Sequence, residues 1–221
     1  MIGEKLTEIY DVLFKAFGPQ HWWPGQTRFE IVTGAILTQN TSWANVEKAI
    51  ANLKAAGCLE PAALHGLSLS QLAELVRPAG YFNIKAKRIK SFLDWLFENY
   101  CGRLENLEPL ETHRLREELL AIRGIGPETA DSILLYAFER PVFVVDAYTA
   151  RIAARHGLIE PGADYAQLQD LFKTGLPRDV RLFNEYHALL VRLGKDFCKP
   201  KPRCPICPLR DLPHSLENEY R

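Results

Sequence analysis

A chain of 221 residues, 47% of them hydrophobic, can bury a sizeable core as one large domain or as two smaller ones. Lys plus Arg number 27 and Asp plus Glu also number 27, so a nucleic-acid partner would require a local basic face. No apolar run approaches the length of a transmembrane helix, and the acidic N-terminal segment does not resemble a signal peptide. We therefore expect a cytoplasmic protein with no membrane partner.

Apolar residues recur at intervals of three and four over most of the chain, which predicts amphipathic helices. In chain order, we expect helices over residues 6–17, 29–37, 44–53, 72–76, 89–97, 115–122, 130–138, 148–156, 168–172 and 182–193. Val142–Val145 could form a short strand, but it is too isolated to build a sheet. The sequence therefore predicts an all-α fold.

A glycine-rich turn separates two of these predicted helices. Gly124 and Gly126 lack a Cβ, so the backbone can turn sharply and approach another molecule closely. Pro127 suits the first position of the helix that follows, where a missing N–H costs nothing. The open amides at the start of that helix could bind a phosphate. An ordinary helix–helix turn would have the same sequence pattern.

Asp146 ends a buried apolar run and precedes a predicted helix. An aspartate in this position commonly caps the helix by accepting hydrogen bonds from its first amides. A carboxylate beside a DNA-binding hairpin could also stabilise a developing sugar cation or orient a water molecule toward it. The two roles are compatible.

Several motifs together carry a family resemblance. Arg123–Asp131 followed by Val144–Asp146 resembles the helix–hairpin–helix and Gly/Pro-Asp signature of the endonuclease III superfamily of DNA glycosylases. Ile36–Thr41 and Gly80–Ile89 also fit this superfamily, so the resemblance spans roughly residues 22–207. It implies binding of double-stranded DNA, with the damaged nucleotide flipped out of the stack. We expect the protein to act as a monomer.

The resemblance also implies a division into two helical domains with a DNA-binding cleft between them. A six-helix barrel carrying the helix–hairpin–helix would occupy residues 25–140. Residues 1–24 and 141–221 would form the second helical domain, which includes the cysteine-rich loop.

Glu128 separates this chain from the members of the superfamily that also cut the DNA strand. Those enzymes have a lysine at this position, which attacks the sugar and forms a Schiff base. A carboxylate cannot form an imine, so the resemblance implies a monofunctional glycosylase with Asp146 as its principal catalytic group. The position of Glu128 in the first turn of a helix also suits the helix dipole.

Other segments most resemble the bacterial 3-methyladenine DNA glycosylases of this superfamily: Trp22-Trp23-Pro24, Leu37–Thr41, Val76–Gly80, and Gly124–Gly126 with Glu128. An alkylated purine is cationic and already a good leaving group, so its binding favours electron-rich aromatic faces. Each such face would contribute a cation–π interaction of about 0.5–2 kcal/mol.

Trp22, Trp23 and Trp43 could supply those faces, although packing in the core explains any one of them equally well. Tyr148 could line the same pocket or pack beneath it. Gln39 corresponds to the residue that fills the gap left by the flipped base in relatives of endonuclease III, where its amide could bond the orphaned base. Alternatively, Gln39 bonds only the local backbone.

Five basic residues and no acidic one occur between Arg77 and Lys90. With the resemblance accepted, Lys85, Lys87 and Arg88 are candidates to contact DNA phosphates. A solvated helix face is the alternative explanation for such a run.

Three of the five cysteines crowd together near the C-terminus, which favours metal chemistry over a disulfide framework. Cys198, Cys204 and Cys207 resemble the loop that binds a [4Fe–4S] cluster in endonuclease III. The first spacing is one residue short, and Pro213 occupies the expected place of the fourth cysteine, which leaves His214 as the nearest replacement ligand.

A structural zinc ion or a loop without metal are the alternatives to the cluster. The loop also carries Lys195, Lys199, Lys201 and Arg203, a local basic patch suited to a DNA backbone.

Two other classes of function stay open on sequence grounds. One is a glycosylase for uracil or thymine in mismatches, or for oxidised pyrimidines. The other is a helix–hairpin–helix DNA-binding protein without catalytic activity.

Overall fold

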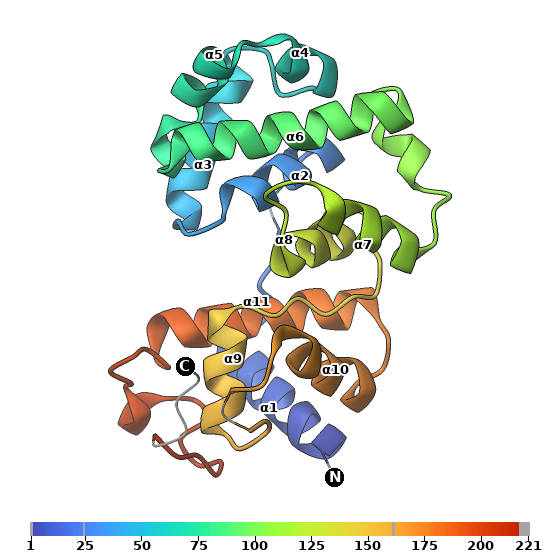
Figure 1. Ribbon diagram of the computed structural model, residues 1–221. Coiled ribbons are helices and arrows are strands. Elements are labelled where there is room, and N and C mark those ends of the chain that lie inside the picture. Colours follow the sequence, from blue (N-terminus) through green and yellow to red (C-terminus); the bar gives the residue numbers. More distant parts are fainter. Residues whose placement is uncertain (1, 24, 161, 217–221) are drawn as a thin grey trace. The chain divides into compact units, whose positions relative to one another are not determined.

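The computed structural model describes residues 2–23, 25–160 and 162–216, so Pro24 of the Trp22-Trp23-Pro24 turn lies outside the described residues. Helices joined by loops make up these residues, and no β-strand occurs among them (Figure 1). The prediction of an all-α fold is therefore confirmed. The chain divides into two compact units, one formed by Met1–Trp22 with Arg140–Arg221 and the other by Trp23–Glu139.

The unit Trp23–Glu139 is a cluster of helices around α6. Its α-helices are α2 (Arg28–Leu37), α3 (Trp43–Ala55), α4 (Pro61–Gly66), α5 (Leu69–Leu75), α6 (Phe82–Tyr100), α7 (Thr112–Ala121) and α8 (Pro127–Ser132). Short 3-10 helices cover Arg77–Ala79 and Leu104–Leu107. The last helix, α8, continues directly into a π-helical segment, Ile133–Ala137.

The buried face of α6 holds this unit together. Helices α2, α4 and α5 all pack against α6. Its buried residues follow the helical spacing of three and four: Lys85, Ala86, Ile89, Phe92, Leu93 and Leu96. Burial of apolar surface of this kind stabilises the unit by about 25 cal/mol for each Å² removed from water.

The second unit contains α1 (Ile2–Phe17), α9 (Ala147–Arg155), α10 (Tyr165–Gly175) and α11 (Val180–Asp196), and a short 3-10 helix at Cys204–Ile206. Helix α11 contacts both α9 and α1, and α1 also contacts α10. Four aromatic rings form the centre of this unit, with the rings of Phe143 and Phe172 stacked 4.1 Å apart. Phe183 and Tyr186 of α11 meet Phe143 edge-on.

Val142–Val145, the only segment considered for a strand, is an extended and buried connection without strand pairing. Its apolar side chains belong to the core of this unit, and the segment ends at Asp146, where α9 begins. The apolar run that suggested a strand therefore reflects burial of a connecting segment rather than a sheet.

Side chains cap several of the described helices at their N-termini. Thr27 accepts a hydrogen bond from the amide of Glu30 at the start of α2, and Asp179 does the same for Leu182 at the start of α11. Ser68 with Gln71, and Asp164 with Gln167, form full capping boxes. Each cap satisfies amides that the helix itself leaves unbonded, a contribution of about 1 kcal/mol.

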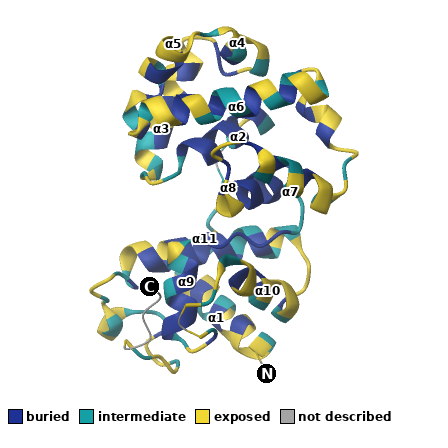
Figure 2. Ribbon diagram, in the orientation of Figure 1, coloured by how far each residue is buried: buried dark blue, intermediate teal, exposed yellow. Residues whose placement is uncertain are grey.

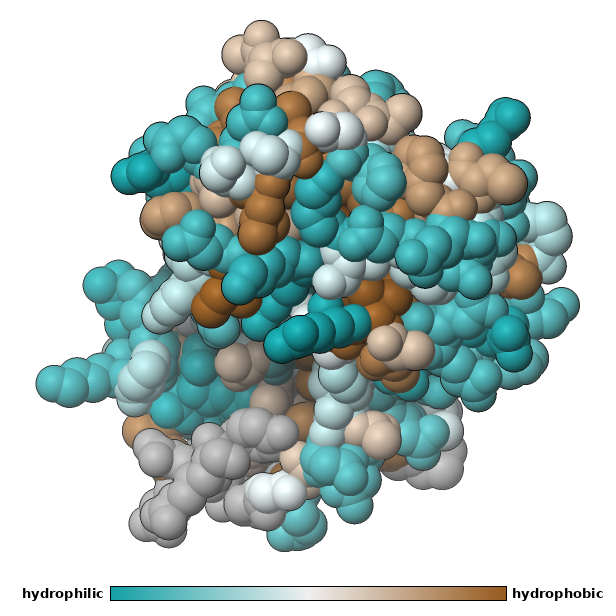
Figure 3. All heavy atoms as spheres, turned by 45° about the horizontal axis from the view of Figure 1, so that its top comes forward, coloured by the Kyte–Doolittle hydropathy of each residue, from teal (hydrophilic) through white to brown (hydrophobic). Residues whose placement is uncertain are grey.

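Burial is concentrated on the inward faces of the helices, as the colouring of Figure 2 shows. On the face seen in Figure 3, hydrophilic side chains predominate and hydrophobic ones occur in small separate groups. Among the described residues, no helix is long and apolar enough to cross a membrane.

Candidate functional site

The glycine turn between α7 and α8 needs a glycine at its first position. Gly124 has a φ of +91°, and a Cβ on this residue would lie 2.5 Å from Cγ of Arg88. Gly126 is the N-cap of α8, and no atom lies within 4 Å of the place its Cβ would occupy. Pro127 occupies the first turn of α8, as predicted. The turn therefore combines a backbone that only glycine tolerates well with an uncovered approach at Gly126.

Gln39 lies against this turn. Its Nε2 donates hydrogen bonds to Oγ1 of Thr129, at 2.8 Å, and to the carbonyl oxygen of Gly124, at 3.2 Å. Arg88 of α6 donates from Nη1 to Oε1 of Gln39. The structure thus brings together three of the residues singled out in the sequence, Gln39, Arg88 and Gly124. The amide of Gln39 thus bonds the hairpin, at residues 85 and 90 positions away in the sequence, rather than only its local backbone, which was the alternative considered for it.

Lys85 requires a correction. Its side chain is fully buried, and its Nζ donates to the carbonyl oxygen of Ala79 at 2.6 Å. Burial, with a smaller effect from the charge of Arg88, lowers the pKa of Lys85 to about 8. Lys85 therefore does not present its charge to a phosphate, because it supports the carbonyl end of the 3-10 helix Arg77–Ala79. Lys87 is exposed and Arg88 is half-buried.

Asp146 is the N-cap of α9, as its position in the sequence predicted. Its Oδ1 accepts hydrogen bonds from the amide of Thr149, at 2.7 Å, and from Oγ1 of Thr149, at 2.9 Å. Its Oδ2 lies 3.6 Å from Nε2 of His187, and the two side chains are only 12% and 6% exposed. Each carboxylate oxygen therefore has its own neighbour.

Burial alone would raise the pKa of Asp146, but the net pKa lies below its ordinary value. The interaction with the nearby His187 side chain, followed by the two bonds from Thr149, outweighs the cost of burial. Asp146 is therefore an ionised carboxylate in a largely buried place, a combination that serves to stabilise a positive charge.

His187 is a residue of this site that no sequence motif indicates. It is a histidine on the buried face of the amphipathic helix α11, 41 positions from Asp146 in a chain of this length. The helical periodicity predicts its burial but not its neighbour, because the pairing depends on how α11 packs on α9.

Tyr148 packs against the far end of α11. A Cβ on Gly194 would lie 2.3 Å from Cδ1 of Tyr148, so the tyrosine ring occupies the space that the missing side chain leaves. The guanidinium of Arg151 lies over the other part of this ring, 5.3 Å from its centroid, and its Nε donates to the carbonyl oxygen of Cys198. Tyr148 thus packs between α9 and α11, which is one of the two roles considered for it.

The three tryptophans of the predicted pocket do not form one cluster. Trp23 meets Trp43 edge-on at 4.7 Å and stacks on Tyr136 at 4.8 Å, all within the unit Trp23–Glu139. Trp22 belongs to the other unit, where Nζ of Lys195 lies 5.8 Å above its ring.

Trp23 and Trp43 line an open hollow with a cavity volume of about 220 Å³. Glu30 and Lys54 line it as well and form an ion pair at 2.8 Å, in which the glutamate is 9% exposed. The hollow combines aromatic faces with acidic side chains.

Glu128 lies in the first turn of α8 and is exposed. Its own carbonyl oxygen accepts a hydrogen bond from Oγ of Ser132. The position next to the hairpin glycines is therefore accessible and carries a carboxylate, which cannot form a Schiff base.

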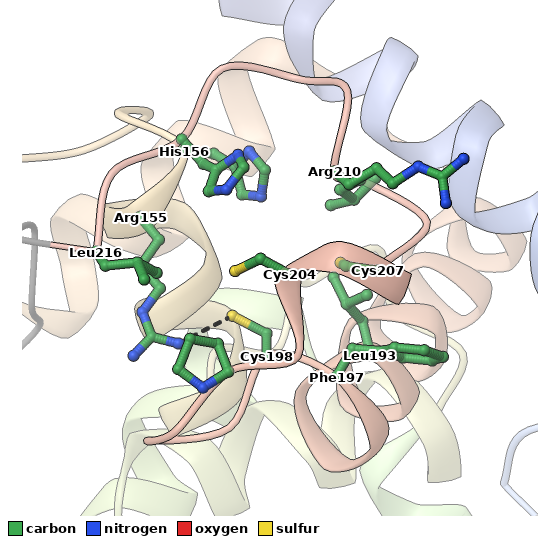
Figure 4. Close-up of a pocket in the computed structure, with 12 residues that line it drawn as sticks. Arg155, His156, Leu193, Phe197, Cys198, Cys204, Cys207, Arg210 and Leu216 are labelled. Carbon is green, nitrogen blue, oxygen red and sulfur yellow. Dashed lines mark hydrogen bonds between the residues drawn. The ribbon is translucent and has the colours of Figure 1, made fainter.

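The C-terminal cysteines share one hollow with a cavity volume of only about 20 Å³, which is lined by Cys198, Cys204, Cys207, His156 and His214. Figure 4 shows the cysteine side chains around this space, with the ring of His156 facing it. Burial, together with the charges of Cys198 and Cys204, raises the pKa of the Cys207 thiol.

As placed, none of the described His, Cys, Asp and Glu residues form a group of three or more that could hold a single metal ion. Cysteine sulfur and histidine nitrogen are donors that an iron–sulfur cluster accepts, but as placed the donors around this hollow do not converge on one metal position. His214 is exposed, and its Nδ1 bonds the carbonyl oxygen of Leu212.

Comparisons with known proteins place this arrangement among DNA repair proteins. A family model described as HhH-GPD superfamily base excision DNA repair protein matches residues 33–178. A protein of Methanocaldococcus jannaschii that is provisionally named a DNA repair glycosylase is 48% identical over 211 residues, covering 95% of this chain and 96% of the relative.

Solved structures agree. The H. pylori 3-methyladenine DNA glycosylase bound to 1,N6-ethenoadenine has a TM-score of 0.75 and 32% identity, covering 88% of this chain and 97% of that one. Endonuclease III in a non-covalent complex with DNA has a TM-score of 0.81, covers 95% of this chain and 94% of that one, and is 23% identical. The second likeness concerns the fold alone.

Proposed function

Because this chain belongs to the HhH-GPD superfamily and is a base excision repair DNA glycosylase, we propose that it hydrolyses the N-glycosidic bond of alkylated purines, 3-methyladenine first. The product would be an abasic site in an uncut strand. The observation that carries the proposal is the ionised, largely buried carboxylate of Asp146, which Thr149 and His187 hold at the start of α9.

Asp146 would act on the sugar. As the bond to an alkylated base breaks, positive charge develops on the deoxyribose, and a nearby carboxylate stabilises it or orients the attacking water. The base leaves readily because alkylation has already made it cationic. Little acid assistance is needed, so one carboxylate suffices for the chemistry.

The aromatic side chains favour a cationic purine as the substrate. Trp23 and Trp43 present ring faces and edges beside the acidic side chain of Glu30. The H. pylori structure to which this chain is 32% identical is a 3-methyladenine glycosylase with an ethenoadenine bound. Trp22 and Tyr148 are further candidates for contacts to the base, since both lie in the unit that carries Asp146.

The absence of strand cleavage rests on Glu128. This exposed carboxylate stands where the strand-cutting relatives have a lysine, and it cannot form the covalent imine. Borohydride, which traps such an imine, should therefore yield no protein–DNA adduct.

The glycine turn and its neighbours would hold the DNA. The uncovered backbone at Gly126 can approach a phosphate closely, and Lys87 is exposed on α6. Gln39 would enter the gap left by the flipped base after its bonds to Thr129 and Gly124 are released. Arg88 would contact phosphate from the same region.

We also propose that Cys198, Cys204, Cys207 and His214 assemble around a [4Fe–4S] cluster, with zinc or an empty loop as the alternatives. Glycosidic hydrolysis needs no electron transfer, so the cluster would order the loop and its exposed basic residues Lys195, Lys201 and Arg203. Measurement of iron, sulfide and zinc in purified protein, with an absorption spectrum, separates the three cases.

A base-release assay tests the proposed function. The native protein and Asp146→Asn are each incubated with three kinds of duplex. One kind is methylated, one contains uracil or thymine in mismatches, and one contains oxidised pyrimidines. We expect release of 3-methyladenine by the native protein and a loss of at least about a hundredfold in the variant. Release of uracil but not of 3-methyladenine would show that the substrate is uracil rather than an alkylated purine. Release that persists undiminished in Asp146→Asn would overturn the catalytic role of Asp146.

A further inference from the structure

The pair formed by Asp146 and His187 has a feature that the proposed function does not require. The two oxygens of the carboxylate face different partners. Oδ1 receives both bonds from Thr149, whereas Oδ2 faces Nε2 of His187 at 3.6 Å. The Asp146 side chain therefore has only one oxygen left to act, and His187 borders that oxygen.

His187 is well placed to control Oδ2 because its own position is fixed. Its side chain is 6% exposed and lies on α11, which packs against α9. Tyr186, the preceding residue, is fully buried in the aromatic centre and donates to the carbonyl oxygen of Leu6 at 2.8 Å. The backbone on which His187 stands is thus held by the core of the unit.

The separation of 3.6 Å is longer than that of a close hydrogen bond. At this distance the ring nitrogen of His187 can still influence how the Asp146 carboxylate is turned, but it leaves Oδ2 able to accept further hydrogen bonds. Oδ2 can therefore accept a bond from water or approach a sugar while His187 continues to orient it.

We propose that His187 is a positioning residue for base excision, which orients Oδ2 of Asp146 toward the reacting sugar while Thr149 holds Oδ1. This inference rests on the proposed function of Asp146. It assigns His187 no contact with the substrate. It predicts instead that any effect of His187 passes entirely through Asp146.

Two substitutions separate orientation from packing. His187→Leu removes the ring nitrogen and keeps an apolar side chain of moderate size. His187→Gln keeps a nitrogen donor at a similar distance from the backbone, without the ring. Leu189→Ala is a matched control, because Leu189 is also fully buried on α11 and has no assigned role in the reaction.

The experiment measures single-turnover base release from a methylated duplex at saturating enzyme, the Kd for the same DNA, and the thermal midpoint of each variant. We expect His187→Leu to lower the rate about 10- to 100-fold with Kd unchanged within threefold, since misplacement of a catalytic group has effects of this size. His187→Gln should recover at least about tenfold of that loss. Leu189→Ala should lower the thermal midpoint while its rate stays within threefold of the native rate.

A double-mutant cycle tests whether His187 acts through Asp146. In the Asp146→Asn background, His187→Leu should cause no further loss of rate. A further tenfold loss would show an independent role and would overturn the proposal. Three other results would also overturn the proposal. They are a native rate in His187→Leu, a rate in His187→Gln as low as that in His187→Leu, and a variant whose DNA affinity is weakened while its rate is unchanged.

Failure of this inference is distinct from failure of the proposed function. If Asp146→Asn abolishes base release and the His187 variants retain it, only the positioning role of His187 is wrong. If the native protein and Asp146→Asn do not differ on any duplex, the proposed function itself is wrong.

Discussion

Asp146 both caps α9 and supplies the charge proposed for catalysis, and two substitutions should separate these roles. Asparagine keeps an oxygen that can accept the bonds from Thr149, and asparagine is as good an N-cap as aspartate. Alanine removes the acceptor. We therefore expect Asp146→Asn to be nearly as stable as the native protein and Asp146→Ala to be clearly destabilised, while both variants lose base release.

The magnitudes follow from the two bonds that Oδ1 accepts from Thr149, at 2.7 and 2.9 Å. In Asp146→Ala the helix loses its cap, at about 1 kcal/mol, and the buried hydroxyl of Thr149 loses its acceptor, at about 1–3 kcal/mol. The unfolding free energy should fall by about 3 kcal/mol, which corresponds to about 6–12 °C in Tm for a chain of this length. In Asp146→Asn the bonds weaken but remain, so the loss should be about 1 kcal/mol.

The catalytic effect has a different origin. A unit charge at about 4 Å from a developing cation contributes about 4 kcal/mol at an effective dielectric constant of 20. Removal of that charge lowers the rate about a thousandfold, whether the replacement is asparagine or alanine.

Denaturant unfolding and single-turnover base release from a methylated duplex, measured on the same preparations, test both statements. Equal loss of stability in the two variants would refute the account of the cap. Base release by Asp146→Asn within tenfold of the native rate would refute the account of the charge.

Three further predictions concern other positions. Gly194→Ala should reduce stability by about 1–3 kcal/mol and slow base release, because its Cβ would lie 2.3 Å from the ring of Tyr148; an unchanged Tm would contradict this. The pKa of Lys85 is about 8 in the folded chain and near 10.5 in the unfolded chain, so the unfolded state binds more protons between pH 8 and pH 10.5. The free energy of unfolding in denaturant should therefore rise with pH over this range, and Lys85→Met should lack that rise. Parallel pH profiles of the two proteins would refute this prediction. Gly124→Ala should weaken DNA binding and lower the free energy of unfolding by about 1–2 kcal/mol, because the φ of Gly124 is +91°. Gly126→Ala should leave the free energy of unfolding nearly unchanged, because no atom lies near the place of its Cβ. Equal effects of the two substitutions in melting and DNA-titration experiments would contradict this prediction.

Helix positions were predicted well where apolar spacing carries the information, and less well at their ends. The helix expected over residues 168–172 is α10, Tyr165–Gly175, because a capping box at Asp164 starts it three residues earlier with polar residues. Likewise α6 begins at Phe82, seven residues before the apolar face that indicated it. The short helix α4, Pro61–Gly66, has a single buried residue, Leu64, and so offers no periodicity to detect.

Lys85 illustrates a limit of charge patterns. In the sequence it is one of several basic residues and cannot be distinguished from Lys87. In the structure the helical phase of α6 turns Lys85 inward and Lys87 outward. Because the apolar neighbours Ala86 and Ile89 share the face of Lys85, its burial could have been read from the spacing, but the acceptor at Ala79 could not.

The sequence by itself determined the all-α class, the glycine turn with Pro127, and Asp146 as a helix cap, because each depends on neighbouring residues along the chain. The tertiary structure decided which side chains meet. It set His187 beside Asp146, stacked Trp23 on Tyr136 while Trp22 joined the other unit, and gathered three cysteines around one hollow. These contacts depend on how one helix packs on another. The apolar spacing within a helix predicts which of its faces is buried, but not which side chains of other helices that face will contact.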